Sequence, residues 1–330
     1  MTKVLITGIA GLIGSNFSRY LLDKGYEVVG IDNFFGGYID FVDPRVKLYE
    51  IDLYNAMYVD DIFREENFDY VYHFAAYAAE GLSPFIRNFN YTNNVLCSIN
   101  IINSCIKYNV KKIIFTSSMA VYGVGNPPFT EDQKQTPIDP YGIAKYTVEM
   151  DIKQANEQFG LRYTIVRPHN IIGIYQNIWD KYRNVIGIWI RQTIRGEKLS
   201  IFGDGTQQRA FSDIHYYMEI FHKLMDEGDL ETFNIGADKH YKIIDVANIV
   251  KNIGKSKGYE TDIIHYEARH EVKDAYSDHT KAKKILNFND ETNIDELIKK
   301  MFDWALTQPD RPTKIMDYEI EKNIYSYWKK

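Results

Sequence analysis

The stretch VLITGIAGLIGS, residues 4–15, joins a short apolar run to three glycines, Gly8, Gly11 and Gly14. A continuous apolar run that ends in glycine is typical of a strand buried on both faces of a parallel sheet. Apolar side chains then recur at helical spacing across residues 13–21. The stretch therefore predicts a strand, a tight turn and a helix in direct succession.

The glycine turn predicts a site for a dinucleotide. Glycines let the backbone approach a pyrophosphate, and the start of the following helix offers free N–H groups and partial positive charge. Asp32 ends the next apolar run, 18 residues past Gly14, where a carboxylate can hold the adenosine ribose hydroxyls. That carboxylate would repel a 2′-phosphate, so NAD is favoured over NADP. A structural glycine turn with a capping aspartate is the alternative.

The remaining order of elements predicts an α/β fold. Further strand-like runs alternate with helical patterns, and this alternation calls for right-handed crossovers and a Rossmann-type, doubly wound parallel sheet. We expect a nucleotide-binding domain over residues 1–168, whose sheet regains a strand from about 205–240, and a mainly substrate-binding smaller lobe over 169–330. The predicted strands are 28–31, 46–51, 70–74, 113–116, 163–166 and 261–266, and the predicted helices are 90–108, from about 142, 184–196, 243–253 and 279–307.

Composition excludes several classes of protein. The chain has 330 residues, 45% apolar and 25% charged, with a formal net charge of −6, which argues against disorder and against a binder of nucleic acid polymers. No apolar run is long enough to cross a membrane and no leader pattern is visible. Cys97 and Cys105 cannot build a disulfide framework or a CxxC metal site. These features predict a cytoplasmic protein with no membrane partner and no metal.

Tyr141 and Lys145 suggest acid–base chemistry. They stand four apart at an expected helix start, so they share one helix face. An ammonium, together with an oxidised nicotinamide ring, would lower the pKa of the phenol, which could then take a proton from a substrate hydroxyl. Ser118 follows a predicted strand at the sheet edge where such folds bind ligands. Taken alone, the Tyr and Lys pair is better explained by a plain helix face, because these two residues often stand four apart by chance.

Two further strand ends carry candidate cofactor residues. Asp52 follows the third run and could accept from the adenine amino group, or cap a helix instead. The small residues of HFAA, 73–76, would let the backbone lie along the dinucleotide. His73 itself is expected to be buried structure.

Together, TGIAGLIGS, Asp32, HFAA, FTSSMAVYG, YGIAK, RPHN and FGDGTQQRAFSDI resemble the extended short-chain dehydrogenase/reductase family. The resemblance is to its NAD-dependent nucleotide-sugar epimerase/dehydratase branch, similar to UDP-glucose 4-epimerases, and there is a faint likeness to a capsular GDP-heptose 4-dehydrogenase. It implies a catalytic trio of Ser118, Tyr141 and Lys145. The implied NAD-binding residues are Gly8, Gly11, Leu12, Ile13, Gly14, Asp32, Asn33, Asp52, Leu53, Phe74, Ala75, Ala76, Asn94, Tyr141, Lys145 and Pro168. The implied substrate-binding residues are Ser118, Met119, Asn170, Asn184, Val185, Arg209 and Arg269, the two arginines as a clamp on the diphosphate.

Departures from the family pattern narrow the reaction. Met119 and Ala120 stand where dehydratases of this branch carry Asp-Glu, and neither can protonate a leaving hydroxyl. The same residues argue against decarboxylation and 3,5-epimerisation. The expectation is a 4-epimerase with tightly bound NAD, acting on a UDP- or GDP-sugar for bacterial surface polysaccharide, as a homodimer. The alternatives are a 4-dehydrogenase that releases the keto sugar and, more remotely, a non-catalytic NAD-sensing module.

Overall fold

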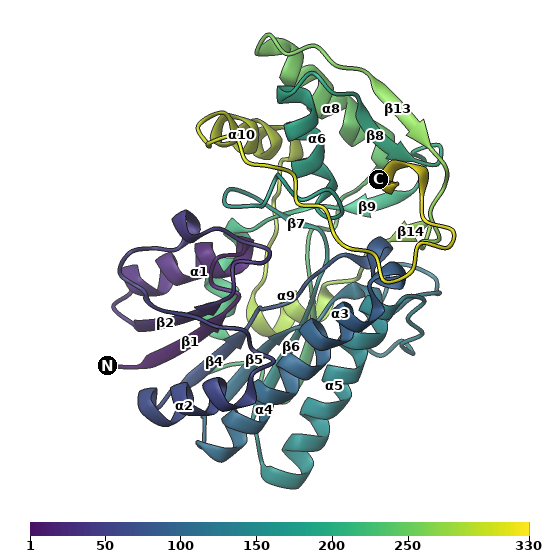
Figure 1. Cartoon of the computed structure of the whole chain (residues 1–330). Coiled ribbons are helices and arrows are strands. Elements are labelled where there is room, and N and C mark those ends of the chain that lie inside the picture. Colours follow the sequence, from purple (N-terminus) through teal and green to yellow (C-terminus); the bar gives the residue numbers. More distant parts are fainter. Residues whose placement is uncertain (330) are drawn as a thin grey trace.

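The computed structural model describes residues 1–329 (Figure 1). Its centre is a seven-stranded parallel sheet in the order β11-β6-β5-β4-β1-β2-β3. The strands form because their near-continuous apolar runs are covered on both faces. The doubly wound α/β fold is thus confirmed. The strands are β1 (Lys3–Thr7), β2 (Glu27–Asp32), β3 (Lys47–Glu50), β4 (Tyr70–His73), β5 (Lys112–Thr116), β6 (Tyr163–Pro168) and β11 (Glu231–Ile235).

Helices cover the two faces of this sheet in separate layers. One layer packs around Phe17, whose ring contacts Tyr72 and Phe221 at centroid distances of 4.6 and 5.6 Å. The other layer packs its apolar side chains on Phe115 and its neighbours. The first layer comprises α1 (Leu12–Asp23), α7 (His215–Lys223) and α9 (Thr280–Leu286), and the second comprises α2 (Ala56–Glu66), α3 (Arg87–Tyr91), the π-helical turn η3 (Thr92–Leu96), α4 (Cys97–Lys107) and α5 (Pro140–Phe159).

Helix α5 begins slightly before the predicted start near 142. Asp139 caps it, because its Oδ1 accepts from the Gly142 N–H at 2.9 Å, and Pro140 suits the first helical position. Tyr141 therefore lies in the first turn, beside the carboxyl end of the sheet.

The smaller lobe holds most of the chain after β6 (Figure 1). Its hydrophobic core contains Trp189, Phe211 and Phe302. The helix predicted over 279–307 is wrong as a single element, because Asn287 adopts a left-handed conformation with φ of 52° and ends the first of two helices. The lobe contains α6 (Val185–Ile194), α8 (Ile243–Ser256), α10 (Ile294–Leu306), β7 (Ile171–Ile172), β8 (Leu199–Phe202), β9 (Gln208–Ala210), β10 (Ser212–Asp213), β12 (His240–Lys242), β13 (Ile263–Tyr266) and β14 (Asp274–Ala275).

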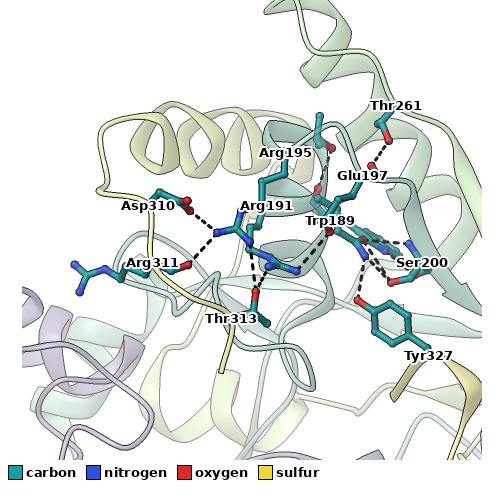
Figure 2. Close-up of polar contacts among 12 residues, drawn as sticks. Trp189, Arg191, Arg195, Glu197, Ser200, Thr261, Asp310, Arg311, Thr313 and Tyr327 are labelled. Carbon is teal, nitrogen blue, oxygen red and sulfur yellow. Dashed lines mark hydrogen bonds and ion pairs between the residues drawn. The ribbon is translucent and has the colours of Figure 1, made fainter. Parts of the chain in front are cut away.

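Residues 310–329, which we call the C-terminal strap, run from the end of α10 back toward the sheet domain (Figure 1). Figure 2 shows how α6 holds the start of the strap: Arg195 donates to the Arg311 carbonyl at 3.0 Å and Arg191 to the Thr313 hydroxyl. Further along, the Glu319 N–H donates to the Phe85 carbonyl at 2.9 Å. The strap thus bridges both parts of the chain. No helix within residues 1–329 is long and apolar enough to cross a membrane.

Candidate active site

A cavity of about 400 Å³ opens at the carboxyl ends of the central strands. It lies beside β1 and β4, where the strand order reverses direction; ligands of open α/β sheets bind at such points. A second cavity of about 110 Å³ adjoins it along the end of β2. Residues of the glycine turn border both cavities, so they form one continuous site.

The glycine turn has the shape that a dinucleotide requires. Gly8 has φ of +71°, and a Cβ atom there would lie 2.8 Å from the Ala75 nitrogen. A Cβ atom on Gly14 would lie 2.3 Å from the Gly8 carbonyl oxygen. The turn also orients Asp32, whose carboxylate accepts from the Ala10 N–H at 2.9 Å. A backbone cradle beside an acid at the end of β2 fits NAD.

Most of the predicted cofactor residues line these two cavities. The larger cavity is bordered by Gly8, Gly11, Leu12, Ile13, Gly14, Phe74, Ala76, Tyr141, Lys145 and Pro168. The smaller one adds Asp32, Asn33, Leu53 and Ala75.

Asp52 and Asn94 lie behind this lining. The carboxylate of Asp52 accepts from the Asn33 amide, so it supports a lining residue. The helix-cap alternative for Asp52 is wrong, because Asn55 caps α2. Asn94 is 1% exposed and holds the loop after β4 by accepting from the Tyr77 N–H at 2.9 Å. Contact of Asp52 or Asn94 with the cofactor stays a prediction.

Ser118, Tyr141 and Lys145 meet at one wall of the larger cavity. Ser118 follows β5, and its hydrogen bond to Tyr141 lowers the pKa of that phenol. The Lys145 ammonium donates to the Thr116 carbonyl at 2.8 Å, which fixes its position against the strand end. Two segments of the chain, the end of β5 and the first turns of α5, thus converge on one point.

The ionisation of this trio differs from the sequence expectation. Burial raises the pKa of Tyr141 above its usual value, and the negative charges of Glu80 and Asp139 raise it further. Burial also lowers the pKa of Lys145 to about 7, against the opposing effect of Glu149. The expectation named Lys145 and an oxidised nicotinamide as sources of positive charge. The positive charge that lowers the pKa of Tyr141 in the structure is that of Arg183, and burial outweighs it.

A buried ion pair supports the trio from behind. Arg167 and Glu149 pair at 2.6 Å with side-chain exposures of 1% and 0%, and the Ser117 hydroxyl donates to the same carboxylate. The neighbouring His73 is fully buried between Thr7 and Ser98, to whose hydroxyls its two ring nitrogens bond at 2.7 and 2.8 Å. It is structural, as expected.

Apart from Ser118 and its neighbour Met119, the predicted substrate residues lie on segments of the chain after β6. Asn170 anchors its amide to the Ala210 carbonyl at 2.9 Å, and Asn184 caps α6 with φ of 63°. Ser118, Asn170, Asn184, Val185, Arg209 and Arg269 border the larger cavity, and Met119 borders a side pocket next to Ser118.

The two arginines differ in what they can still bind. Arg209 already donates to the carbonyls of Gln208, Lys273 and Val272 at 2.9, 2.8 and 2.7 Å, and pairs with Glu271. Arg269 pairs with Glu271 at 3.3 Å, and its buried Nε has no partner within residues 1–329. Arg269 therefore has donors free for a diphosphate, whereas the donors of Arg209 are largely occupied.

The sequence model of the NAD dependent epimerase/dehydratase family matches residues 4–236. The chain belongs to this family. It is therefore an NAD-dependent enzyme, and NAD is the cofactor that the glycine turn fits.

Relatives and solved structures resemble nearly the whole chain. A putative UDP-glucose 4-epimerase of Methanocaldococcus jannaschii is 31% identical over 91% of this chain and 97% of its own. A UDP-glucuronate 4-epimerase of Thermodesulfobacterium geofontis is 29% identical over 92% and 96%. The crystal structure of UDP-glucose 4-epimerase from Thermotoga maritima with UDP-glucose superposes with a TM-score of 0.87 and 30% identity, over 92% of this chain and 99% of that one.

Several residues of this family member's cavity were missed by the sequence analysis. Arg183 borders both cavities and is held by Asp180 at 2.9 Å and by the Gly36 carbonyl at 3.0 Å. Glu80, Lys181 and the strap residues Tyr327 and Trp328 also border the larger cavity. Arg183 stands directly before the predicted Asn184, which is the one local signal that could have revealed it. Within residues 1–329 no cluster of side chains suited to a metal ion is found.

Proposed function

We propose that this chain is a nucleotide-sugar 4-epimerase that keeps NAD bound and acts on a UDP-sugar. One observation carries the proposal: a single cavity holds Ser118, Tyr141 and Lys145 on one side and the glycine turn with Asp32 on the other. The printed activities of the relatives support carbon 4 of a UDP-sugar as the reacting position.

The chemistry that NAD supplies when bound is the reversible acceptance of a hydride from the sugar carbon. Tyr141 takes the proton of the carbon-4 hydroxyl as that carbon becomes a ketone, with Ser118 hydrogen-bonded to the same oxygen. After rotation of the keto sugar, bound NAD would supply the hydride to the opposite face, and Tyr141 would return the proton to the oxygen. Lys145 would hold the nicotinamide ribose.

Residues 119 and 120 lack the acid that dehydration of the keto sugar would need. Met119 and Ala120 offer no acid that could protonate a leaving hydroxyl, and Ala120 is 8% exposed within the short helix η4 (Met119–Val121). Neither residue can therefore drive dehydration of the keto sugar, which favours return of the hydride over loss of a hydroxyl.

The test is to mix the purified protein with UDP-glucose, and in parallel with GDP-mannose, without an added acceptor. We expect NMR to show UDP-galactose accumulating while the absorbance of reduced nicotinamide stays flat. A single stoichiometric burst of reduced nicotinamide with a released keto sugar would show a 4-dehydrogenase instead. If NAD bound but neither sugar changed, the chain would be a non-catalytic NAD-sensing module. If only the GDP-sugar were converted, the nucleotide of the substrate would be GDP and not UDP.

We also propose a homodimer that works in the cytoplasm. Leu96, Ile143 and Met150 expose 48%, 40% and 48% of their surface on η3 and the adjoining α5, and an apolar face of this kind suits a second copy. The two cysteines are free and buried, as in a reducing compartment. Light scattering of Met150→Asp, which we expect to be monomeric, tests the dimer. A role in surface polysaccharide is part of the proposal, to be tested by the glycan composition of a deletion strain.

A further inference from the structure

A side pocket of about 90 Å³ continues from the larger cavity past Ser118. It shares Glu80, Ser118, Asn170 and Arg209 with that cavity, so whatever reacts at Ser118 lies at its mouth. Its remaining lining is apolar or uncharged, apart from the ring of His169.

Glu80 is the unusual group in this pocket. It begins the short helix η2 (Glu80–Phe85), and Ser83 ties that helix to the catalytic wall by donating to the Glu80 carbonyl at 2.8 Å and accepting from the Tyr141 N–H at 3.1 Å. The Glu80 side chain is exposed to the cavity, and no described residue within 1–329 forms a hydrogen bond or an ion pair with its carboxylate. An unpartnered carboxylate beside a reacting centre is available to a ligand.

The charge of Glu80 depends on pH near neutrality. Loss of contact with bulk water inside the cavity, together with the negative charge of Asp139, raises the pKa of Glu80 to about 7, so the group is a carboxylate above that pH. The negative charge of Glu271 also raises the pKa of Glu80, whereas Arg209 and Arg269 lower it. Both arginines form ion pairs with Glu271. Burial lowers the pKa of His169 to about 3, so that ring is neutral. The pocket therefore presents hydrogen-bond acceptors, and the donors of Arg209, the cation on its described lining, are largely occupied.

The chemistry of the ring brings two groups of the sugar to this pocket. When the carbon-4 hydroxyl lies at Ser118 and Tyr141, carbons 3 and 5 flank it, and carbon 6 is two bonds away. Rotation of the ring during 4-epimerisation exchanges the two sides. The carbon-3 hydroxyl and the carbon-6 group therefore each come near the side pocket in one of the two states.

We propose that Glu80 sets the sugar specificity: it accepts hydrogen bonds from the hydroxyls of a neutral sugar and excludes sugars that carry a carboxylate at carbon 6. This inference rests on the proposed function and narrows its substrate to neutral, hydroxylated sugars. A hydroxyl can donate to the free carboxylate, which is a strong, charge-assisted contact. A second carboxylate at the same place meets a like charge, and the donors of Arg209, which borders the pocket, are already largely occupied.

The experiment measures binding and turnover by the NAD-loaded enzyme for UDP-glucose and UDP-glucuronate, with GDP-mannose and GDP-mannuronate in parallel. The variants are wild type, Glu80→Gln and the control Glu157→Gln, which changes an exposed acid on α5. We expect wild type to prefer the neutral sugar by at least ~30-fold in Kd and in kcat/KM, as a like-charge contact of several kcal/mol implies. In Glu80→Gln this preference falls at least ~10-fold while NAD content is unchanged. The control behaves as wild type.

Two results overturn the role of Glu80: a wild type that binds and converts the uronate as well as the neutral sugar, or a Glu80→Gln variant that keeps the full preference. Failure of the proposed function has separate signatures: either neither nucleotide series binds to the NAD-loaded enzyme, or a bound sugar is oxidised with a stoichiometric burst of reduced nicotinamide and is not epimerised. A change in the preference also distinguishes a substrate contact from a purely structural role. Misfolding would weaken the binding of both sugars and lower the NAD content at the same time.

Discussion

Replacement of Trp328 by alanine should open the substrate side of the cavity and leave the cofactor side intact. The side chain is 1% exposed, and its ring packs at 5.5 Å from Tyr182, 6.1 Å from Phe85 and 6.0 Å from Phe202. This aromatic cluster is separate from the two cores that flank the sheet. The free energy lost at Trp328 is therefore lost chiefly from docking of the C-terminal strap.

The magnitude follows from the size of the buried ring. Truncation of a buried Trp to Ala costs about 3–5 kcal/mol, and every 1.4 kcal/mol is a factor of ten, so the ratio of opened to docked strap rises at least ~100-fold. Trp328 and Tyr327 border the cavity, and the Arg269 guanidinium lies 4.3 Å from the Phe202 ring within the same cluster. We expect KM for UDP-glucose to rise ~10- to 100-fold, with NAD content unchanged, because the glycine turn lies outside the cluster.

The assay combines steady-state kinetics with limited proteolysis of the NAD-loaded enzyme, in which the variant should be cut in the strap well before the rest of the chain. Trp328→Phe is the matched control: Nε1 of Trp328 has no partner within residues 1–329, so the phenylalanine keeps an aromatic ring and loses no hydrogen bond. Ile315→Ala, at a strap position that is 58% exposed, controls for mutation of the strap itself. If Trp328→Ala kept both the KM and the protease pattern of wild type, the strap would not close the site and the reasoning would be refuted.

Three further outcomes follow from the catalytic wall and the glycine turn. Tyr141→Phe should lower kcat by at least ~100-fold with NAD still bound, since the phenol is the proton carrier; a kcat within a few-fold of wild type would contradict that role. Gly14→Ala should lose NAD on gel filtration, because its new Cβ would lie 2.3 Å from the Gly8 carbonyl oxygen; retained cofactor would show that the turn can relax. Glu80→Gln removes a negative charge that raises the pKa of Tyr141, so the acid limb of the kcat/KM profile should move to lower pH, and an unmoved limb would place the limiting ionisation elsewhere.

The parts of the fold that sequence predicted are those set by local patterns. The turn between β1 and α1 depends on the absence of side chains at three nearby positions, and the start of α5 depends on a cap followed by proline. Both signals lie within a few residues of what they determine. The prediction of one helix over 279–307 passed over the segment 287–293, NFNDETN, whose Asn, Asp and Thr residues favour turns, and the second helix begins only at Ile294.

The candidate site was predictable only as far as its members sit at strand ends or in a recognisable motif. Ser118, Tyr141 and Lys145 meet that condition. Arg183 and Glu80 do not, because each lies on an irregular segment whose path is fixed by contacts far along the chain, such as the bond from Arg183 to Gly36. No periodicity in the sequence marks such a residue as facing a cavity.

The pKa of Tyr141 shows why the identity of a catalytic residue is easier to predict than its strength. The spacing of Tyr141 and Lys145 is local, and it placed both on one wall correctly. The sign of the shift depends on how much water the other walls exclude and on charges from separate segments, namely Glu80, Asp139 and Arg183. Glu80 and Asp139 are acids whose negative charge disfavours the phenolate. Positive charge brought by bound NAD must therefore offset both acids, as well as burial, before Tyr141 loses its proton. Glu80, which we propose selects the sugar, therefore also links proton transfer at Tyr141 to occupancy of the cofactor site, together with Asp139.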